Sequence, residues 1–293
     1  MPDPANKRLG FSIPTLGGKQ LWADEFICGG YRIQENIVSG HHRLLNPADI
    51  RLCWGTWSRC KEEFDSLYQS GSVHLPSRHL VLLVHGVFRS KDSFGPMARA
   101  LRRAGYDAQA VNYPSTRRSL ESHAEQIERI LDRAEHFDQV SFVCHSMGGI
   151  VIRMLLGQAN AWRQHLSPKR LVMIATPNQG SEIAETFASF PVFEITAGPS
   201  VRQLHRDQIQ AVPIPNIPFG TIAGSSGRST GYNPLLPGDD DLTVTVASTT
   251  LEGAEDELIV PAMHTFIMSK PEVIAATLHY LQTGRFLPAE NGS

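Results

Sequence analysis

The chain has 293 residues, of which 41% are hydrophobic and 19% are charged, and its formal net charge is −2. This composition can form a sizeable core, which excludes an intrinsically disordered chain. With no excess of basic residues, we expect no nucleic-acid partner.

The cysteines and the N-terminus bear on cellular location. The four cysteines, at positions 28, 53, 60 and 144, form no C-x-x-C pair and have no zinc-ligand spacing with histidines. We expect reduced thiols, with a Cys53–Cys60 bridge as the alternative. No apolar segment of a signal peptide follows Lys7 and Arg8, and no window approaches the roughly 18 apolar residues of a membrane span. The sequence therefore predicts a cytoplasmic protein with no membrane span.

Residues 1–75 are expected to form an N-terminal extension, a hairpin plus a helix, packed on the core. Gly29 and Gly30 separate two strand-like runs, a spacing typical of a two-residue β-hairpin turn. Apolar residues recur at helical spacing from Ser58, a candidate cap, to Gly71. No residue of this segment points to a chemical role.

From residue 79 onward, short apolar runs alternate with helical patterns. The runs are continuous and rich in Val, Leu and Ile, as in strands that are buried on both faces. Alternation of this kind predicts an α/β fold, with a mostly parallel sheet and helices on both faces. The predicted strands are 79–86, 107–114, 139–146, 170–177, 218–226 and 256–264, and the predicted helices are 94–104, 120–134, 147–155 and 271–282.

One predicted strand ends in the sequence C-H-S-M-G, a variant of the G-x-S-x-G elbow. Such a turn presents a serine, here Ser146, at the start of a helix and requires small flanking residues. Gly148 meets that demand, and Cys144 stands at the position of the first glycine. Because backbone N–H groups are free at a helix start, the N–H of Met147 is a candidate oxyanion donor.

The loop after the strand at 79–86 is the expected source of a second oxyanion donor. His85 and Gly86 close that strand, and glycine lets the backbone approach a substrate closely. The N–H of Val87 is the first candidate for the donor, and that of Phe88 is the alternative.

A nucleophilic serine also needs a base, and the base needs an orienting carboxylate. On sheets of this type both follow the serine along the chain. His264 stands after the last predicted strand, whereas the positions of His165, His205 and His279 do not suit a base.

The acid is expected in a run of three aspartates that precedes the last strand. Asp241 is the first candidate for the acid, and Asp240 is the alternative. A triple-Asp loop could also bind calcium, but it lacks the spacing of an EF-hand, so no metal is expected.

Five motifs, HGVFRS, CHSMGG, ATPNQGS, DDDLTV and HTF, carry a family resemblance. Their order and spacing resemble the bacterial lipase/esterase branch of the α/β-hydrolase superfamily over about residues 79–284. In that family the acid commonly lies in D-G-x-V, whereas Leu242 replaces the glycine here. The resemblance implies an α/β-hydrolase catalytic domain over 76–293 that hydrolyses carboxylic esters, either small molecules or lipids, without a cofactor.

The substrate and the outcome of the reaction stay open at this point. The insertion 181–217 could be a lid over an acyl pocket or a packed connection, so the choice between esterase and true lipase is undecided. An acyltransferase would use the same triad, and a catalytically inactive binding protein would keep the fold alone. The oligomeric state is not predicted.

Overall fold

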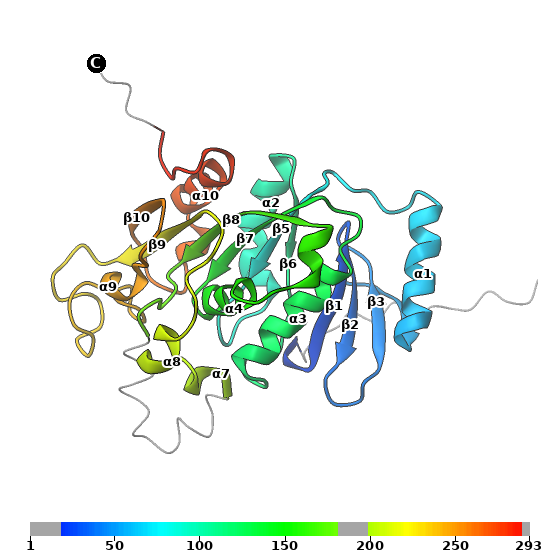
Figure 1. Cartoon of the computed structure of the whole chain (residues 1–293), viewed down its shortest axis with the longest axis horizontal. Coiled ribbons are helices and arrows are strands. Elements are labelled where there is room, and N and C mark those ends of the chain that lie inside the picture. Colours follow the sequence, from blue (N-terminus) through cyan, green and yellow to red (C-terminus); the bar gives the residue numbers. More distant parts are fainter. Residues whose placement is uncertain (1–18, 181–198, 289–293) are drawn as a thin grey trace, which may run out of the picture.

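The computed structural model describes residues 19–180 and 199–288 of the chain, which contain two β-sheets. The larger sheet has six strands in the order β10-β9-β8-β7-β5-β6, and the smaller has four in the order β1-β2-β3-β4. Figure 1 shows the smaller sheet beside the β6 end of the larger one, far from β10.

All neighbouring strands of the six-stranded sheet are parallel. Its strands are β5 (His79–Val84), β6 (Asp107–Ala110), β7 (Gln139–His145), β8 (Ser167–Ile174), β9 (Phe219–Ser225) and β10 (Asp256–Pro261). Their carboxyl ends therefore meet at one edge of the sheet, where open α/β sheets place their ligand sites.

Helices cover both faces of this sheet (Figure 1). One face carries α3 (Leu120–Asp132) and α4 (Met147–Leu156), and the other carries α2 (Gly95–Arg103) and α10 (Pro271–Thr283). The remaining short helices are η1 (Lys19–Leu21), η2 (Lys91–Phe94), η3 (Ala161–Gln164), α7 (Pro199–Arg202), α8 (Arg206–Gln210), α9 (Val246–Thr249) and η4 (Ile267–Ser269).

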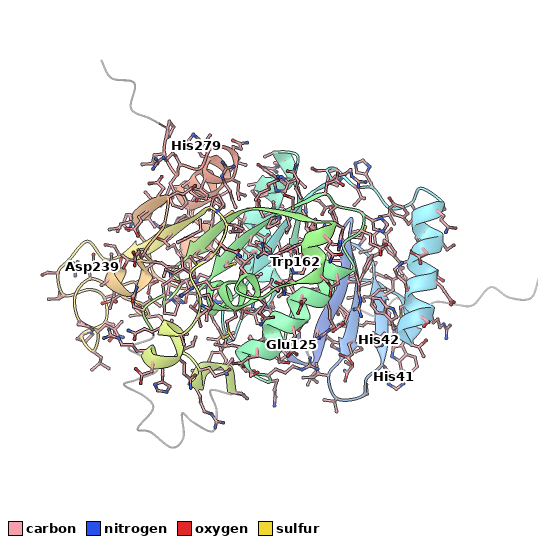
Figure 2. All side chains as sticks on the ribbon, viewed as in Figure 1. His41, His42, Glu125, Trp162, Asp239 and His279 are labelled. Atoms are coloured by element: carbon pink, nitrogen blue, oxygen red, sulfur yellow. The ribbon has the colours of Figure 1, made fainter. Side chains whose placement is uncertain are left out.

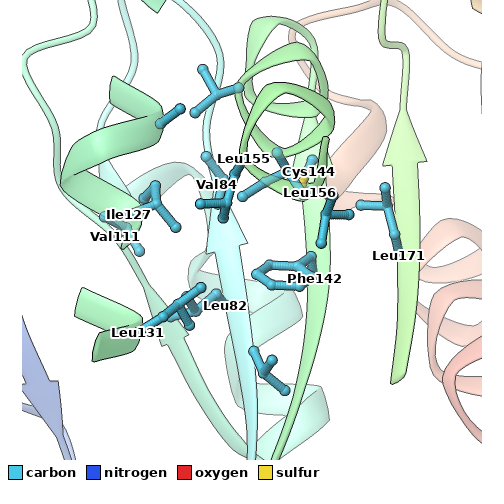
Figure 3. Close-up of a cluster of buried hydrophobic side chains, with 14 of the residues drawn as sticks. Leu82, Val84, Val111, Ile127, Leu131, Phe142, Cys144, Leu155, Leu156 and Leu171 are labelled. Carbon is cyan, nitrogen blue, oxygen red and sulfur yellow. The ribbon is translucent and has the colours of Figure 1, made fainter. Parts of the chain in front are cut away.

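In the central strand β5 every residue after His79 is apolar and buried, because successive side chains point to opposite faces and both faces are covered. In β5, Leu82 and Val84 join the cluster under α3 and α4, whereas Val81 and Leu83 join the cluster under α2 and α10. Figure 3 shows the first cluster, where these strand side chains meet residues of α3 and α4. This packing fixes the strand ends that position the site.

The smaller sheet is antiparallel and is built from β1 (Trp22–Cys28), β2 (Tyr31–Asn36), β3 (His42–Leu45) and β4 (Arg51–Gly55). Helix α1 (Trp57–Gln69) packs on one face of the sheet through Cys60 and Phe64. The sequence predicted a hairpin and a helix here, and β3 and β4 were not predicted. The N-cap of α1 is Thr56, not Ser58, since the Thr56 side chain accepts from the Arg59 N–H.

Polar contacts join strand β1 to the larger sheet. The Asp24 N–H donates to the Asn112 carbonyl at 2.9 Å, and Glu25 forms ion pairs with Arg129 and Arg133 of the α3 region. The contact with Asn112 also explains why β6 ends at Ala110 instead of at residue 114: the backbone beyond β6 turns to meet β1. That residues 1–75 form an extension distinct from the hydrolase domain stays a prediction.

All four cysteines are free and buried, so Cys53 and Cys60 are not bridged. Burial raises the pKa of the Cys28 thiol to about 12, which makes that side chain an unreactive core residue. None of the described helices combines the length and apolarity needed to cross a bilayer.

The first half of the predicted insertion, 181–198, lies outside the described residues. The second half contains α7 and α8 and is hydrogen-bonded to α3 and α4 of the core. The Arg153 guanidinium donates to the Val212 and Pro213 carbonyls, and the Gln203 side chain accepts from the Leu120 N–H at 2.7 Å. A role for 181–217 as a lid stays a prediction.

Candidate active site

Ser146 lies on a tight turn between the end of β7 and the start of α4. Its φ of 54° and ψ of −129° are rare for a residue with a side chain and cost free energy. The Ser146 N–H donates to the Ile174 carbonyl of β8 at 2.9 Å, which holds this strained backbone in place. The serine side chain is thereby presented at the carboxyl edge of the sheet.

The two glycines after this serine are required by close packing. A Cβ on Gly148 would lie 2.3 Å from the Val84 carbonyl oxygen, and one on Gly149 would lie 2.2 Å from Thr176 Oγ1. No side chain fits at either position. Cys144, at the position of the first glycine of the G-x-S-x-G elbow, need not be glycine, because its side chain lies in the core under α3 and α4 (Figure 3).

His264 and Asp241 form a hydrogen-bonded pair. Nδ1 of His264 lies 2.7 Å from Oδ2 of Asp241, and the His264 N–H donates to the Asp241 carbonyl at 2.8 Å. The other carboxylate oxygen accepts from the N–H groups of Thr243 and Val244 at 3.0 and 2.7 Å. A carboxylate only accepts, so a neutral His264 carries its proton on Nδ1 and leaves Nε2 free to act as a base.

The other two aspartates of the run accept hydrogen bonds from loop residues and not from His264. Asp239 accepts from the N–H and hydroxyl of Ser226, both at 2.8 Å. Asp240, the alternative acid, is fully buried and accepts from the N–H groups of Asn233 and Leu242. The structure therefore brings Asp241, and not Asp240, to the imidazole. The run lies in the long loop between β9 and β10, ahead of the last strand as expected.

Leu242, which stands where the D-G-x-V pattern has glycine, adopts a left-handed backbone conformation. Its φ is 91°, a conformation that glycine adopts freely and leucine only with strain. The backbone at this position therefore has a conformation that suits the glycine of the pattern, although leucine occupies it here.

His145 connects the serine turn to His264. Its Nε2 lies 3.0 Å from the His264 carbonyl oxygen, and the two rings are 4.6 Å apart at their centroids. Burial holds the pKa of His145 well below its usual value, so the ring is neutral and donates from Nε2. Among the described residues no hydrogen bond joins the Ser146 hydroxyl to His264, and in unliganded enzymes this contact is often long.

The loop after β5 lies directly against Ser146. A Cβ on Gly86 would be 2.8 Å from Ser146 Cβ, so the glycine permits this approach. The next residue, Val87, is half-buried, and its N–H has no hydrogen-bond acceptor in the part of the chain that the structure describes. The N–H of Met147, at the first position of α4, likewise has no acceptor within its helix.

Two buried side chains support this loop, and sequence analysis gave neither of them a role. The Tyr113 hydroxyl donates to the His85 carbonyl, and the two rings stack at 4.2 Å. His85 Nδ1 lies 2.8 Å from the Gly86 carbonyl oxygen. Burial lowers the pKa of His85 to about 4, so the ring is neutral. The sequence indicated only that His85 closes the strand before this loop, and nothing in it indicated that Tyr113 packs against His85.

The histidines that were set aside lie away from the serine. His165 contacts the Leu131 carbonyl, His205 precedes α8 without a capping side-chain hydrogen bond, and His279 lies within α10 and contacts the Arg285 carbonyl. In Figure 2, His41 and His42 lie at the opposite end of the molecule from Asp239.

Among residues 19–180 and 199–288, no three His, Cys, Asp or Glu side chains gather in a way that could hold a metal ion.

A family described as "Domain of unknown function (DUF7379)" matches residues 49–190. No curated protein matched the sequence.

Two solved structures show the same fold. The mature form of lipase BlEst2 from Bacillus licheniformis is 18% identical with a TM-score of 0.54, and the match covers 67% of this chain and 89% of that one. The metagenomic carboxyl esterase MGS0156 is 18% identical with a TM-score of 0.53, covering 71% and 76%. With the six-stranded parallel sheet and helices on both faces, these similarities show that the chain has the α/β-hydrolase fold.

Proposed function

We propose that the chain is a serine carboxylic-ester hydrolase that acts through an acyl-enzyme intermediate. The observation that carries this proposal is the 2.7 Å contact between half-buried His264 and fully buried Asp241, beside a strained serine turn at the same sheet edge. The names of the two structural neighbours, a lipase and a carboxyl esterase, support the same class of reaction.

In the first half of the reaction, the Ser146 oxygen attacks the ester carbonyl while His264 Nε2 accepts the hydroxyl proton. Asp241 stabilises the imidazolium that forms. The N–H groups of Val87 and Met147 donate to the oxyanion of the tetrahedral intermediate. His264 then gives the proton to the leaving alcohol as the carbon–oxygen bond breaks, which leaves the acyl group on the serine.

In the second half, water takes the place of the alcohol. His264 accepts a proton from water as the water oxygen attacks the acyl carbonyl. The proton then passes to the Ser146 oxygen as the carboxylic acid leaves. If another alcohol enters instead, the product is a new ester, which is the acyltransferase outcome.

Apolar side chains near the proposed triad favour substrates with an apolar acyl group. Phe88, Leu242, Met263 and Phe266 each adjoin a proposed site residue in sequence or lie within two residues of it, and each is exposed. Exposed apolar groups at such positions suit the binding of an apolar ligand.

The proposal is tested by labelling the purified chain with a fluorophosphonate and by measuring p-nitrophenyl ester hydrolysis. We expect both signals from the native chain and neither from Ser146→Ala. The exposed Ser58→Ala serves as the matched control and should retain both. A native chain that stays unlabelled would identify an inactive binding protein and contradict the proposal. Product analysis with an added alcohol separates hydrolysis from acyl transfer.

A further inference from the structure

A second candidate site lies where the smaller sheet meets the larger one. A cavity of about 180 Å³ opens between the turns of the four-stranded sheet, helix α2 and strand β6. None of the residues proposed for ester hydrolysis lines it. Its lining residues include Gly30, Arg32, Pro47, Lys91, Arg99 and Gln109.

Positive side chains dominate the lining of this cavity. Arg32, Lys91, Arg99 and Arg102 all line it, against the single acid Asp92. Arg32 is buried and Lys91 is half-buried, whereas Arg99 and Arg102 are exposed to solvent. Cations that converge on one hollow attract anions and raise their local concentration.

Part of this charge is already balanced. Asp24 pairs with Arg32 at 2.7 Å, and Asp49 pairs with Lys91 at 2.6 Å. In contrast, Arg99 and Arg102 form no ion pair with any acid in the described part of the chain.

The remaining cations repel one another. Burial, with added repulsion from Arg32, lowers the pKa of Lys91. Burial also lowers the pKa of Arg102; Asp107 opposes this shift, and Arg32 and Arg99 add to it. A bound anion would reverse the unfavourable electrostatics at both side chains.

Two buried polar atoms of lining residues lack partners. Arg32, only 5% exposed, donates from Nη1 to Asp24 and to the Ala110 carbonyl, but its buried Nε has no partner among the described residues. Gln109, 2% exposed, donates from Nε2 to Asp107, while its buried Oε1 has no partner there. Both atoms are almost inaccessible to solvent, so a ligand in the cavity would reach them after a small shift of the two side chains. Each atom is costly to leave unsatisfied, which favours such a contact.

We propose that this cavity binds a phosphate group, either as the free ion or as a small phosphomonoester. The phosphate oxygens accept from Arg32 and are neutralised by Lys91, Arg99 and Arg102. Hydrogen phosphate, like the monoanion of a phosphomonoester, also carries one O–H, which donates to Gln109 Oε1. Sulfate has the same shape and charge but no proton at neutral pH, so it should bind more weakly.

The location of the site gives binding a structural consequence. Arg32 belongs to the four-stranded sheet, whereas Arg99 and Arg102 belong to α2 on the larger sheet. A phosphate between them would hold the two sheets together. Because a ligand that binds only the folded state stabilises it, phosphate should raise the melting temperature.

The test is isothermal titration calorimetry on the full chain with inorganic phosphate, glycerol 3-phosphate and sulfate, each at matched ionic strength. We expect saturable binding of at least one phosphate compound at millimolar concentration or below, and weaker binding of sulfate. Tighter binding of inorganic phosphate would identify a site for the free ion, and tighter binding of glycerol 3-phosphate a site for a monoester.

Variants locate the binding. The double variant Arg99→Ala/Arg102→Ala should weaken phosphate binding by roughly tenfold or more, since charge-assisted contacts contribute about 1.5–3 kcal/mol each and 1.4 kcal/mol is tenfold. Arg103→Ala, on the same helix but outside the lining, should bind as the native chain does.

Absence of phosphate binding, equal binding of sulfate, or an equal loss in the Arg103 control would overturn the proposal. Because calorimetry does not require turnover, its outcome is independent of whether the chain hydrolyses esters.

Discussion

At the scale of single residues, three adjacent aspartates have three different sets of partners. Each carboxylate binds the donors that its own part of the loop presents: Asp239 at Ser226, Asp240 at Asn233 and Leu242, and Asp241 at Thr243 and Val244. Only Asp241 has a second oxygen directed at the imidazole of His264. The backbone of the loop therefore decides which of the three carboxylates contacts His264. The order of residue types along the chain does not contain this information.

The first prediction at this scale compares two of these aspartates. Asp241→Asn keeps the side-chain shape but offers an amide to His264 Nδ1, which favours the wrong tautomer. We expect kcat for a p-nitrophenyl ester to fall by roughly 10⁴-fold. Asp240→Asn loses loop contacts but leaves His264 bonded, so kcat per folded molecule should fall far less. Equal losses in the two variants, at equal folded fractions by circular dichroism, would remove Asp241 from the triad.

At the scale of elements, the serine turn depends on how closely α4 approaches β5. The conformation of Ser146 is unfavourable on its own and persists because the strand, the turn and the helix are all packed. Gly148 is the point of closest approach, 2.3 Å from a carbonyl oxygen for an added Cβ. The geometry of the turn and the stability of the core are thus linked.

We therefore predict opposite effects for two glycine-to-alanine changes. Gly148→Ala must displace the backbone of β5, so we expect a loss of several kcal/mol in unfolding free energy, as for severe core overpacking. Gly95→Ala, at the start of α2, meets only the flexible end of Arg99 at 3.3 Å and should stabilise by up to about 1 kcal/mol. Urea unfolding measures both, and a Gly148 variant as stable as the native chain would contradict the packing argument.

The predicted elements were accurate where the pattern is strong. The long apolar strands of the central sheet and the helices beginning at Leu120, Met147 and Pro271 lie where the sequence places them. Strands β3 and β4 were missed because they are only four and five residues long. Pairing of β3 with β2 and of β4 with β3, together with packing against α1, holds them in place. Pairing of this kind joins distant residues and leaves little local signal.

At the scale of the whole molecule, three buried histidines lie around the serine turn and the loop beside it. His85 and His123 both contact Tyr113, and His145 contacts His264. Burial lowers the pKa of His85 to about 4 and that of His123 to about 3, with His145 also well below its usual value. Neighbouring positive charge adds to each shift, from Arg89 at His85 and at His145 and from Arg118 at His123.

These shifts predict a pH-dependent stability. Below about pH 6.5 the unfolded chain binds protons at these histidines while the folded chain does not, so stability falls as the pH falls. Each histidine contributes a slope of about 1.4 kcal/mol per pH unit until its folded pKa is reached, and nothing above pH 6.5. The melting temperature should therefore be flat above this pH and fall steeply between about pH 6.5 and 4.

His123→Phe isolates one of these groups, because both of its ring nitrogens lack partners in the described residues. This variant should show a shallower fall in melting temperature on acidification, whereas Ser58→Ala, which changes no titratable group, should leave the slope as it is. A native chain whose melting temperature does not change across this range would refute the assignment of neutral buried histidines.

The sequence by itself determined the class of fold and the candidate nucleophile and base. Apolar runs and a serine between small residues are local features, and each leaves a pattern along the chain. Only the tertiary structure decided which aspartate meets His264, how Tyr113 and His145 support the turn, and that cations from two sheets surround one cavity. These depend on contacts between residues far apart in the chain, whose geometry follows from packing and not from neighbouring residue types.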